Sequence, residues 1–148
     1  MGLAGGQRAM TPLAAVAIAA AGDRLPAGSA VPRLLRHRLV AAGAVALAVG
    51  EMAGDKQRTA PDRIVPVGLL ARFATSAIAG AALSRDGRRG AGALVGGVTA
   101  VAASFPGWRL RVAAMARVGQ CPSGLVEDAV VAGAAALVVR GAANGTLG

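Results

Sequence analysis

Charged residues within or beside apolar stretches are the features of this sequence that could do chemistry. Glu51 and Asp55 stand four residues apart, a spacing that places two carboxylates on one face of a helix. Such carboxylates repel unless a cation or a shared proton lies between them, and they could hold a divalent metal ion through their oxygens. The full candidate set comprises Arg8, Glu51, Asp55, Lys56, Arg63, Arg72, Glu127 and Asp128.

The same charges admit a structural and a functional interpretation. Arg72 lies near the middle of an apolar run, where an unpaired guanidinium is costly in a membrane. In the structural interpretation, one of the two carboxylates pairs with Arg8, Arg63 or Arg72. Glu127 then caps the helix that Glu127-Asp128 opens, where negative charge suits the helix dipole. In the functional interpretation, the same groups form an ion, proton or metal site. The structural one is favoured, because membrane helices do carry buried ion pairs.

The familiar catalytic motifs are missing from the sequence. It has no P-loop, no HExxH zinc motif, no GxSxG elbow and no pair of cysteines. His37 stands between two arginines, which is typical of a solvated loop histidine. Cys121 has no histidine neighbour in the sequence and is expected to be inert. We therefore expect no cofactor and favour a protein that is not an enzyme.

The composition places these charges in a membrane protein. The chain of 148 residues is 55% hydrophobic with a mean hydropathy of +0.57, but it is only 2% aromatic. This excludes a disordered chain, which needs low hydrophobicity, and disfavours a soluble domain, whose core normally uses large side chains. The net charge of +9 comes from arginines in the gaps between apolar runs. Anionic lipid headgroups are therefore favoured as partners over nucleic acid.

Five apolar runs predict an all-α fold, a small multi-pass transmembrane helical bundle in which residues 1–148 form a single domain. The runs cover residues 12–21, 39–53, 64–83, 90–105 and 125–139. A spanning helix needs about 20 residues. The third run reaches that length by itself, and the second, fourth and fifth reach it with their charged flanks. We therefore expect four spans plus a short broken or re-entrant N-terminal helix.

The first apolar run is too short to span a membrane. Thr11 is expected to be its N-cap, with Pro12 at the first helical position, and Gly22 is expected to end the helix. About ten residues give roughly 15 Å of helix, half of a bilayer. One alternative is a single helix over residues 3–21 that kinks at Pro12. Another is a secretory signal peptide, against which the four later apolar runs argue.

The connections are short and basic, and small residues recur along the runs. Residues 31–40 mix arginines with leucines and predict a turn of helix at the headgroups; residues 109–124 are expected to form a connection. Small residues at four-residue spacing let membrane helices approach closely. They occur at Gly2/Gly6, at Gly50/Gly54 and in the longer row Gly92, Gly96, Ala100 and Ser104.

Several segments, taken in order, resemble a known family. They are Gly6-Gln7-Arg8-Ala9-Met10-Thr11-Pro12, Gly50-Glu51-Met52-Ala53-Gly54-Asp55-Lys56, Thr59-Ala60-Pro61-Asp62-Arg63-Ile64-Val65-Pro66, Arg72 and Glu127-Asp128-Ala129. In these the chain resembles the bacterial integral-membrane family known as domain of unknown function four-one-two-six. The Glu-x-x-x-Asp-Lys segment followed by Pro-x-Arg is the most specific part. The Gln57-Arg58-Thr59 stretch departs from the family's Leu-Pro pair after the lysine. The resemblance implies an integral membrane protein that keeps its N-terminal helix, and it brings no established activity.

These observations predict a small multi-pass protein of the bacterial inner membrane. We expect a non-enzymatic permeation, transport or scaffold unit that works as a homo-oligomer in the lipid bilayer, because 148 residues give too few helices to enclose a wide path alone. The alternative is a membrane-embedded enzyme acting on a phosphorylated lipid. Glu51/Asp55 would then hold a divalent metal, and Arg8, Arg63 or Arg72 would bind the phosphate. The permeation hypothesis places the carboxylates in the interior, and the enzyme hypothesis places them at the membrane edge.

Overall fold

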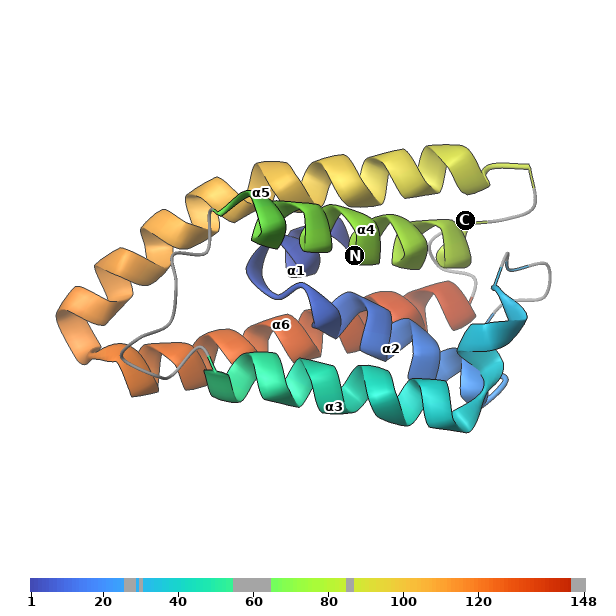
Figure 1. Cartoon of the computed structure of the whole chain (residues 1–148), viewed down its shortest axis with the longest axis horizontal. Helices are drawn as coiled ribbons and strands as arrows, with labels where there is room; N and C mark the ends of the chain where they lie inside the picture. Colours follow the sequence, from blue (N-terminus) through green and yellow to red (C-terminus); the bar gives the residue numbers. More distant parts are fainter. Residues whose placement is uncertain (26–28, 30, 55–64, 85–86, 145–148) are drawn as a thin grey trace.

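The computed structural model describes residues 1–25, 29, 31–54, 65–84 and 87–144. Within these residues the fold is all-α, as the sequence predicts, with no strand. The elements in chain order are α1 (Gly2–Gln7), α2 (Met10–Ala21), the short 3₁₀-helix η1 (Arg33–Arg36), α3 (Arg38–Gly54), α4 (Pro66–Leu83), α5 (Arg89–Val118) and α6 (Gln120–Ala143). The longer helices run roughly along the long axis of the molecule (Figure 1).

Among the described residues, three helices, α4, α5 and α6, are long and apolar enough to cross a membrane. This supports the predicted multi-pass membrane protein. The remaining expected span coincides with α3, which has 17 residues and is not one of these three. The first apolar run corresponds to α2, a shorter apolar helix of 12 residues.

The distribution of side-chain sizes also fits a lipid environment. Most of the buried apolar residues are alanines, with a few valines and one leucine. Large apolar side chains face outward instead: Leu94 on α5 is 62% exposed, and Leu137 on α6 is 69% exposed. Water would favour the reverse arrangement. Lipid solvates large apolar side chains, and small residues in the interior let helices pack closely.

The N-terminal run is broken at Arg8, and the chain reverses direction there. Arg8 has extended backbone angles, φ −136° and ψ 119°, between α1 and α2. The two helices then run in opposite directions (Figure 1). The predicted N-cap at Thr11 and the alternative kink at Pro12 are both wrong, because α2 begins at Met10 with Ala9 as its cap. Pro12 sits in the first turn, where its missing N–H costs little. The predicted end at Gly22 is confirmed.

The expected connection over residues 109–124 is also wrong. α5 continues through Pro106 to Val118, and it bends along its length (Figure 1), as an internal proline allows. Gly119 then joins α5 to α6 with φ +86°, a left-handed conformation that glycine adopts freely. α6 therefore begins at Gln120, so Glu127 and Asp128 lie about two turns inside the helix rather than opening it.

The small-residue row of α5 forms a packing face, as predicted. A Cβ on Gly96 would collide with the Ser76 carbonyl oxygen of α4, and one on Gly92 would lie 2.6 Å from the Gly80 carbonyl oxygen. Gly2 and Gly6 of α1 pack against α5, where a Cβ on Gly6 would lie 2.6 Å from the Cβ of Ala103. The Gly50/Gly54 pair differs, because a Cβ on either residue would meet no described atom within 4 Å.

We expect Gly96→Ala to lower the free energy of unfolding by about 2 kcal/mol, because the added methyl group forces α4 and α5 apart. Gly133→Ala on α6 is the matched control, since a Cβ there meets no described atom within 4 Å. Unfolding of the purified protein in detergent measures both variants. Equal losses at the two sites would contradict the packing face.

Candidate site at the helix break

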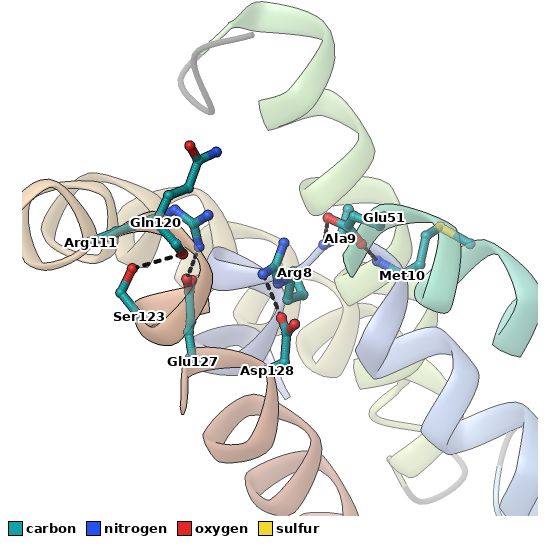
Figure 2. Close-up of polar contacts among 9 residues, drawn as sticks. All are labelled: Arg8, Ala9, Met10, Glu51, Arg111, Gln120, Ser123, Glu127 and Asp128. Carbon is teal, nitrogen blue, oxygen red and sulfur yellow. Dashed lines mark hydrogen bonds and ion pairs between the residues drawn. The ribbon is translucent and has the colours of Figure 1, made fainter. Parts of the chain in front are cut away.

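Arg8 places a guanidinium inside the bundle at the break between α1 and α2. The residue is 1% exposed, and its Nη2 lies 2.5 Å from Oδ1 of Asp128 on α6. Figure 2 shows the two side chains facing each other. The Asp128 side chain is also largely buried. The extended backbone at Arg8 interrupts the helix at this point. The break is thereby tied to α6 by a buried ion pair, whose desolvation demands good geometry and a close partner.

Glu51 binds the first turn of α2 from the last turn of α3. Its Oε1 accepts a hydrogen bond from the Ala9 N–H at 2.8 Å, and its Oε2 accepts one from the Met10 N–H at 2.9 Å (Figure 2). These N–H groups have no partner inside their own helix and carry the positive end of its dipole. Glu51 thus caps a neighbouring helix, and its charge also acts favourably on Arg72.

A second ion pair joins α5 to α6 beside the first. Nη1 of Arg111 lies 2.5 Å from Oε2 of Glu127, and both side chains are largely buried. Figure 2 shows this pair next to Arg8 and Asp128. The prediction that Glu127 caps its own helix is wrong, because Glu127 lies within α6 and binds a neighbouring helix.

Arg72 and Thr75 of α4 lie beside the same helix break. Arg72 is 5% exposed, so its guanidinium is not left in lipid, where an unpaired charge is costly. It lies within electrostatic reach of Glu51, which stabilises its charge, and of Arg8 and Glu127. One turn further along α4, the Thr75 hydroxyl lies 2.6 Å from the Ala9 carbonyl oxygen, to which it can donate a hydrogen bond. The break therefore contacts α3, α4 and α6 through side chains.

The cluster is balanced in charge. Within the described part of the chain it contains three arginines, Arg8, Arg72 and Arg111, and three carboxylates, Glu51, Glu127 and Asp128. Opposite charges lower the cost of holding ionised groups away from water. The cluster can hold the irregular segment at Arg8 in place. Its acidic and basic side chains can also leave their present partners and bind an ion or a proton.

The structure brings together five of the eight predicted site residues: Arg8, Glu51, Arg72, Glu127 and Asp128. The other three, Asp55, Lys56 and Arg63, lie outside the described residues. The proposed metal pair Glu51/Asp55 is therefore described only at Glu51. Among the described residues, no group of three or more His, Cys, Asp or Glu side chains could hold a metal ion.

Two residues with reactive side chains lie apart from the cluster. His37 is exposed, as predicted, and its Nδ1 accepts a hydrogen bond from the Leu39 N–H at 3.3 Å, next to the start of α3. Cys121 is exposed in the first turn of α6. Neither residue contributes to the helix break.

Sequence reasoning missed Arg111 and Thr75 as members of the cluster. Arg111 was expected in a connection, where a charge needs no partner. The sequence around Arg111 gives no sign that this arginine is buried, because it lies two residues after Arg109 with Leu110 between them. Thr75 stands one turn after Arg72, and this i, i+3 spacing is the one clue that both face the same interior.

We expect Glu51→Ala to lower the free energy of unfolding by about 1–2 kcal/mol, because two N–H groups at the start of α2 lose their acceptor. Glu51→Gln keeps one acceptor oxygen and should lose less. Asp23→Asn is the control, since asparagine tolerates the positive φ of this residue and the carboxylate forms an exposed ion pair with Arg36 at 3.3 Å, worth about 0.5 kcal/mol. Detergent unfolding curves measure all three. A loss for Glu51→Ala no larger than that of the control would contradict the cap.

Comparison of the chain with protein-family models, with curated proteins and with solved structures finds no match.

Proposed function

We propose that this chain is a small multi-pass protein of the bacterial inner membrane that passes a small ion or proton across the bilayer. In this proposal α3, α4, α5 and α6 are four spans, and the α1–α2 pair is re-entrant. The observation that carries the proposal is the break at Arg8, which holds ionised side chains from several helices in the interior of an apolar bundle.

Broken helices at membrane depth support an ion pathway for a physical reason. Non-helical backbone is tolerated in a bilayer only where protein or a water-filled cavity covers it. The same discontinuity exposes helix termini and charged side chains to ions, so transporters place their binding sites there. Charged residues inside a membrane are costly and mark functional sites by default.

The enzyme alternative gains no support from the geometry of Glu51. That hypothesis needs the carboxylate open to headgroups at the membrane edge, where it can bind a metal. Both Glu51 oxygens instead accept hydrogen bonds from partly buried backbone N–H groups at the start of α2, so neither is left free for a metal ion. We therefore favour permeation over metal-dependent hydrolysis of a phosphorylated lipid.

The size of the chain supports action as a homo-oligomer. A bundle with so few spans has no room for a wide pathway among its own helices, and its described interior is filled by small residues. A second copy would supply further walls, and the outward leucines and valines of α5 and α6 offer apolar surface for lipid or for that copy.

Flux through proteoliposomes tests the proposal. Vesicles whose membranes contain the purified protein should pass protons, alkali cations or halides faster than protein-free vesicles. Glu51→Gln should reduce that flux by about tenfold, the equivalent of 1.4 kcal/mol at the barrier. Asp23→Asn, at an exposed site, should leave the flux unchanged. Folded, inserted protein that carries none of these ions would contradict permeation.

We expect both termini to face the cytoplasm. The end of the bundle where α2 ends and α3 begins is rich in arginine, with Arg24, Arg33, Arg36, Arg38 and Arg140 all exposed. Such residues remain on the cytoplasmic side of a membrane protein. A reporter fused to the C-terminus that is active only in the cytoplasm should therefore give a signal. A signal only from a reporter active outside would contradict this orientation, and equal signals from both would indicate dual insertion.

A further inference from the structure

A groove between α2, α3 and α6 has an apolar body. Its volume is about 880 Å³, which lies within the usual range for ligand sites. Its walls include Ala14 and Ile18 of α2, Val45 and Val49 of α3, and Ala136 and Val139 of α6. α2 packs against both other helices, so it forms the floor along which the groove runs.

One end of this groove is basic. Arg24 and Arg140 line it there, beside Asn144. Both arginines are exposed, and neither forms an ion pair with any described residue. Asp23, the neighbouring carboxylate, pairs with Arg36. The groove therefore combines an apolar channel with two cationic side chains that can bind an anion.

The length of the groove matches one leaflet of a bilayer. Its α6 lining runs over residues 132–144, which correspond to about 18 Å of helix. Half of the hydrocarbon core of a bilayer is about 15 Å. An acyl chain running along the groove would place its headgroup beside the arginine-rich end of the bundle.

We propose that this groove binds an anionic phospholipid, with an acyl chain along the apolar walls and the phosphate held by Arg24 and Arg140. Guanidinium groups suit phosphate oxygens because they donate two parallel, charge-assisted hydrogen bonds. A second copy of this chain is a poorer occupant. It would bring a net charge of +9 towards the two arginines, whereas a phospholipid brings the complementary charge.

Lipid retention by the full chain tests this site. The detergent-purified protein is mixed with equal amounts of phosphatidylglycerol and phosphatidylcholine, and bound lipid is counted by native mass spectrometry. Wild type should retain phosphatidylglycerol about tenfold more than phosphatidylcholine, a preference of 1.4 kcal/mol. Arg24→Gln/Arg140→Gln should reduce this preference to within about twofold. Arg109→Gln/Arg117→Gln removes two exposed arginines of α5 and should leave the preference unchanged.

A second variant tests the apolar part of the groove. Ala136→Trp fills it from α6 and should reduce the retention of both lipids, while the melting temperature without added lipid shows that the fold is kept. Equal retention of the two lipids by wild type would overturn the proposal, as would an unchanged preference in Arg24→Gln/Arg140→Gln. Lipid retention by Ala136→Trp at the wild-type level would overturn the assignment to this groove. Loss of a dimer in Ala136→Trp, without lipid selectivity in wild type, would assign the groove to a second copy instead.

Discussion

Asp128→Leu is expected to lower the free energy of unfolding by about 4 kcal/mol. The substitution removes the carboxylate that lies 2.5 Å from the buried guanidinium of Arg8, and a buried charge that loses its partner is strongly destabilising. Unfolding in detergent, followed by helical circular dichroism, measures the loss. A double variant, Arg8→Met/Asp128→Leu, should recover most of it, because apolar side chains of similar size replace both charges.

Asp23→Asn is the control for this prediction, because asparagine tolerates the left-handed backbone at this position, where φ is +49°. Its carboxylate is 85% exposed in the ion pair with Arg36, and exposed pairs contribute little to stability. Similar losses at Asp23 and Asp128 would mean that Arg8 does not depend on its carboxylate. No recovery in the double variant would mean that the charge of Arg8 itself holds the break.

Arg72→Ala is expected to destabilise the protein by about 3 kcal/mol, because it removes a buried cation whose charge stabilises the partly buried carboxylate of Glu51. Among the described residues, Glu51 has the largest favourable electrostatic effect on Arg72. The combined cost of Arg72→Ala and Glu51→Ala should therefore be smaller than the sum of the two single costs, by 0.5–3 kcal/mol. Thermal unfolding of the four proteins in the cycle measures this coupling.

Arg117→Ala supplies the control, because Arg117 is an exposed arginine near the end of α5. It should change stability by less than about 0.5 kcal/mol. If the stability costs of Arg72→Ala and Glu51→Ala are strictly additive, Arg72 does not interact with the helix break. That result would mean that α4 contributes no charge to the cluster.

Features that depend on local chemistry could be predicted from the sequence. Gly22 ends α2 because glycine readily leaves a helix, and Gly96 packs closely because its spacing from Gly92 places both on one face. The interior position of Arg72 followed from its place within an apolar run, since a lone guanidinium avoids lipid.

Features that depend on which helix faces meet could not be predicted. Arg111 and Glu127 are 16 residues apart, and only the sharp reversal at Gly119 brings them together. The early start of α2 depends on Glu51, 41 residues from Met10, to satisfy its first N–H groups. A connection was expected over residues 109–124, but α5 continues through Pro106 to Val118, because a membrane helix tolerates a proline when its neighbours satisfy the freed groups.

The water accessibility of the helix break tests the central claim most directly. In a Cys121→Ser background, Ala9→Cys places a thiol at the break, and Val98→Cys places one on the outward face of α5. Ala79→Cys places a third thiol in the buried core. A membrane-impermeant thiol reagent is applied to each side of sealed vesicles. If the break serves ion permeation, the thiol at position 9 will react from at least one side, while those at positions 79 and 98 stay protected. Equal protection at all three positions would show that the buried charges only hold the fold together.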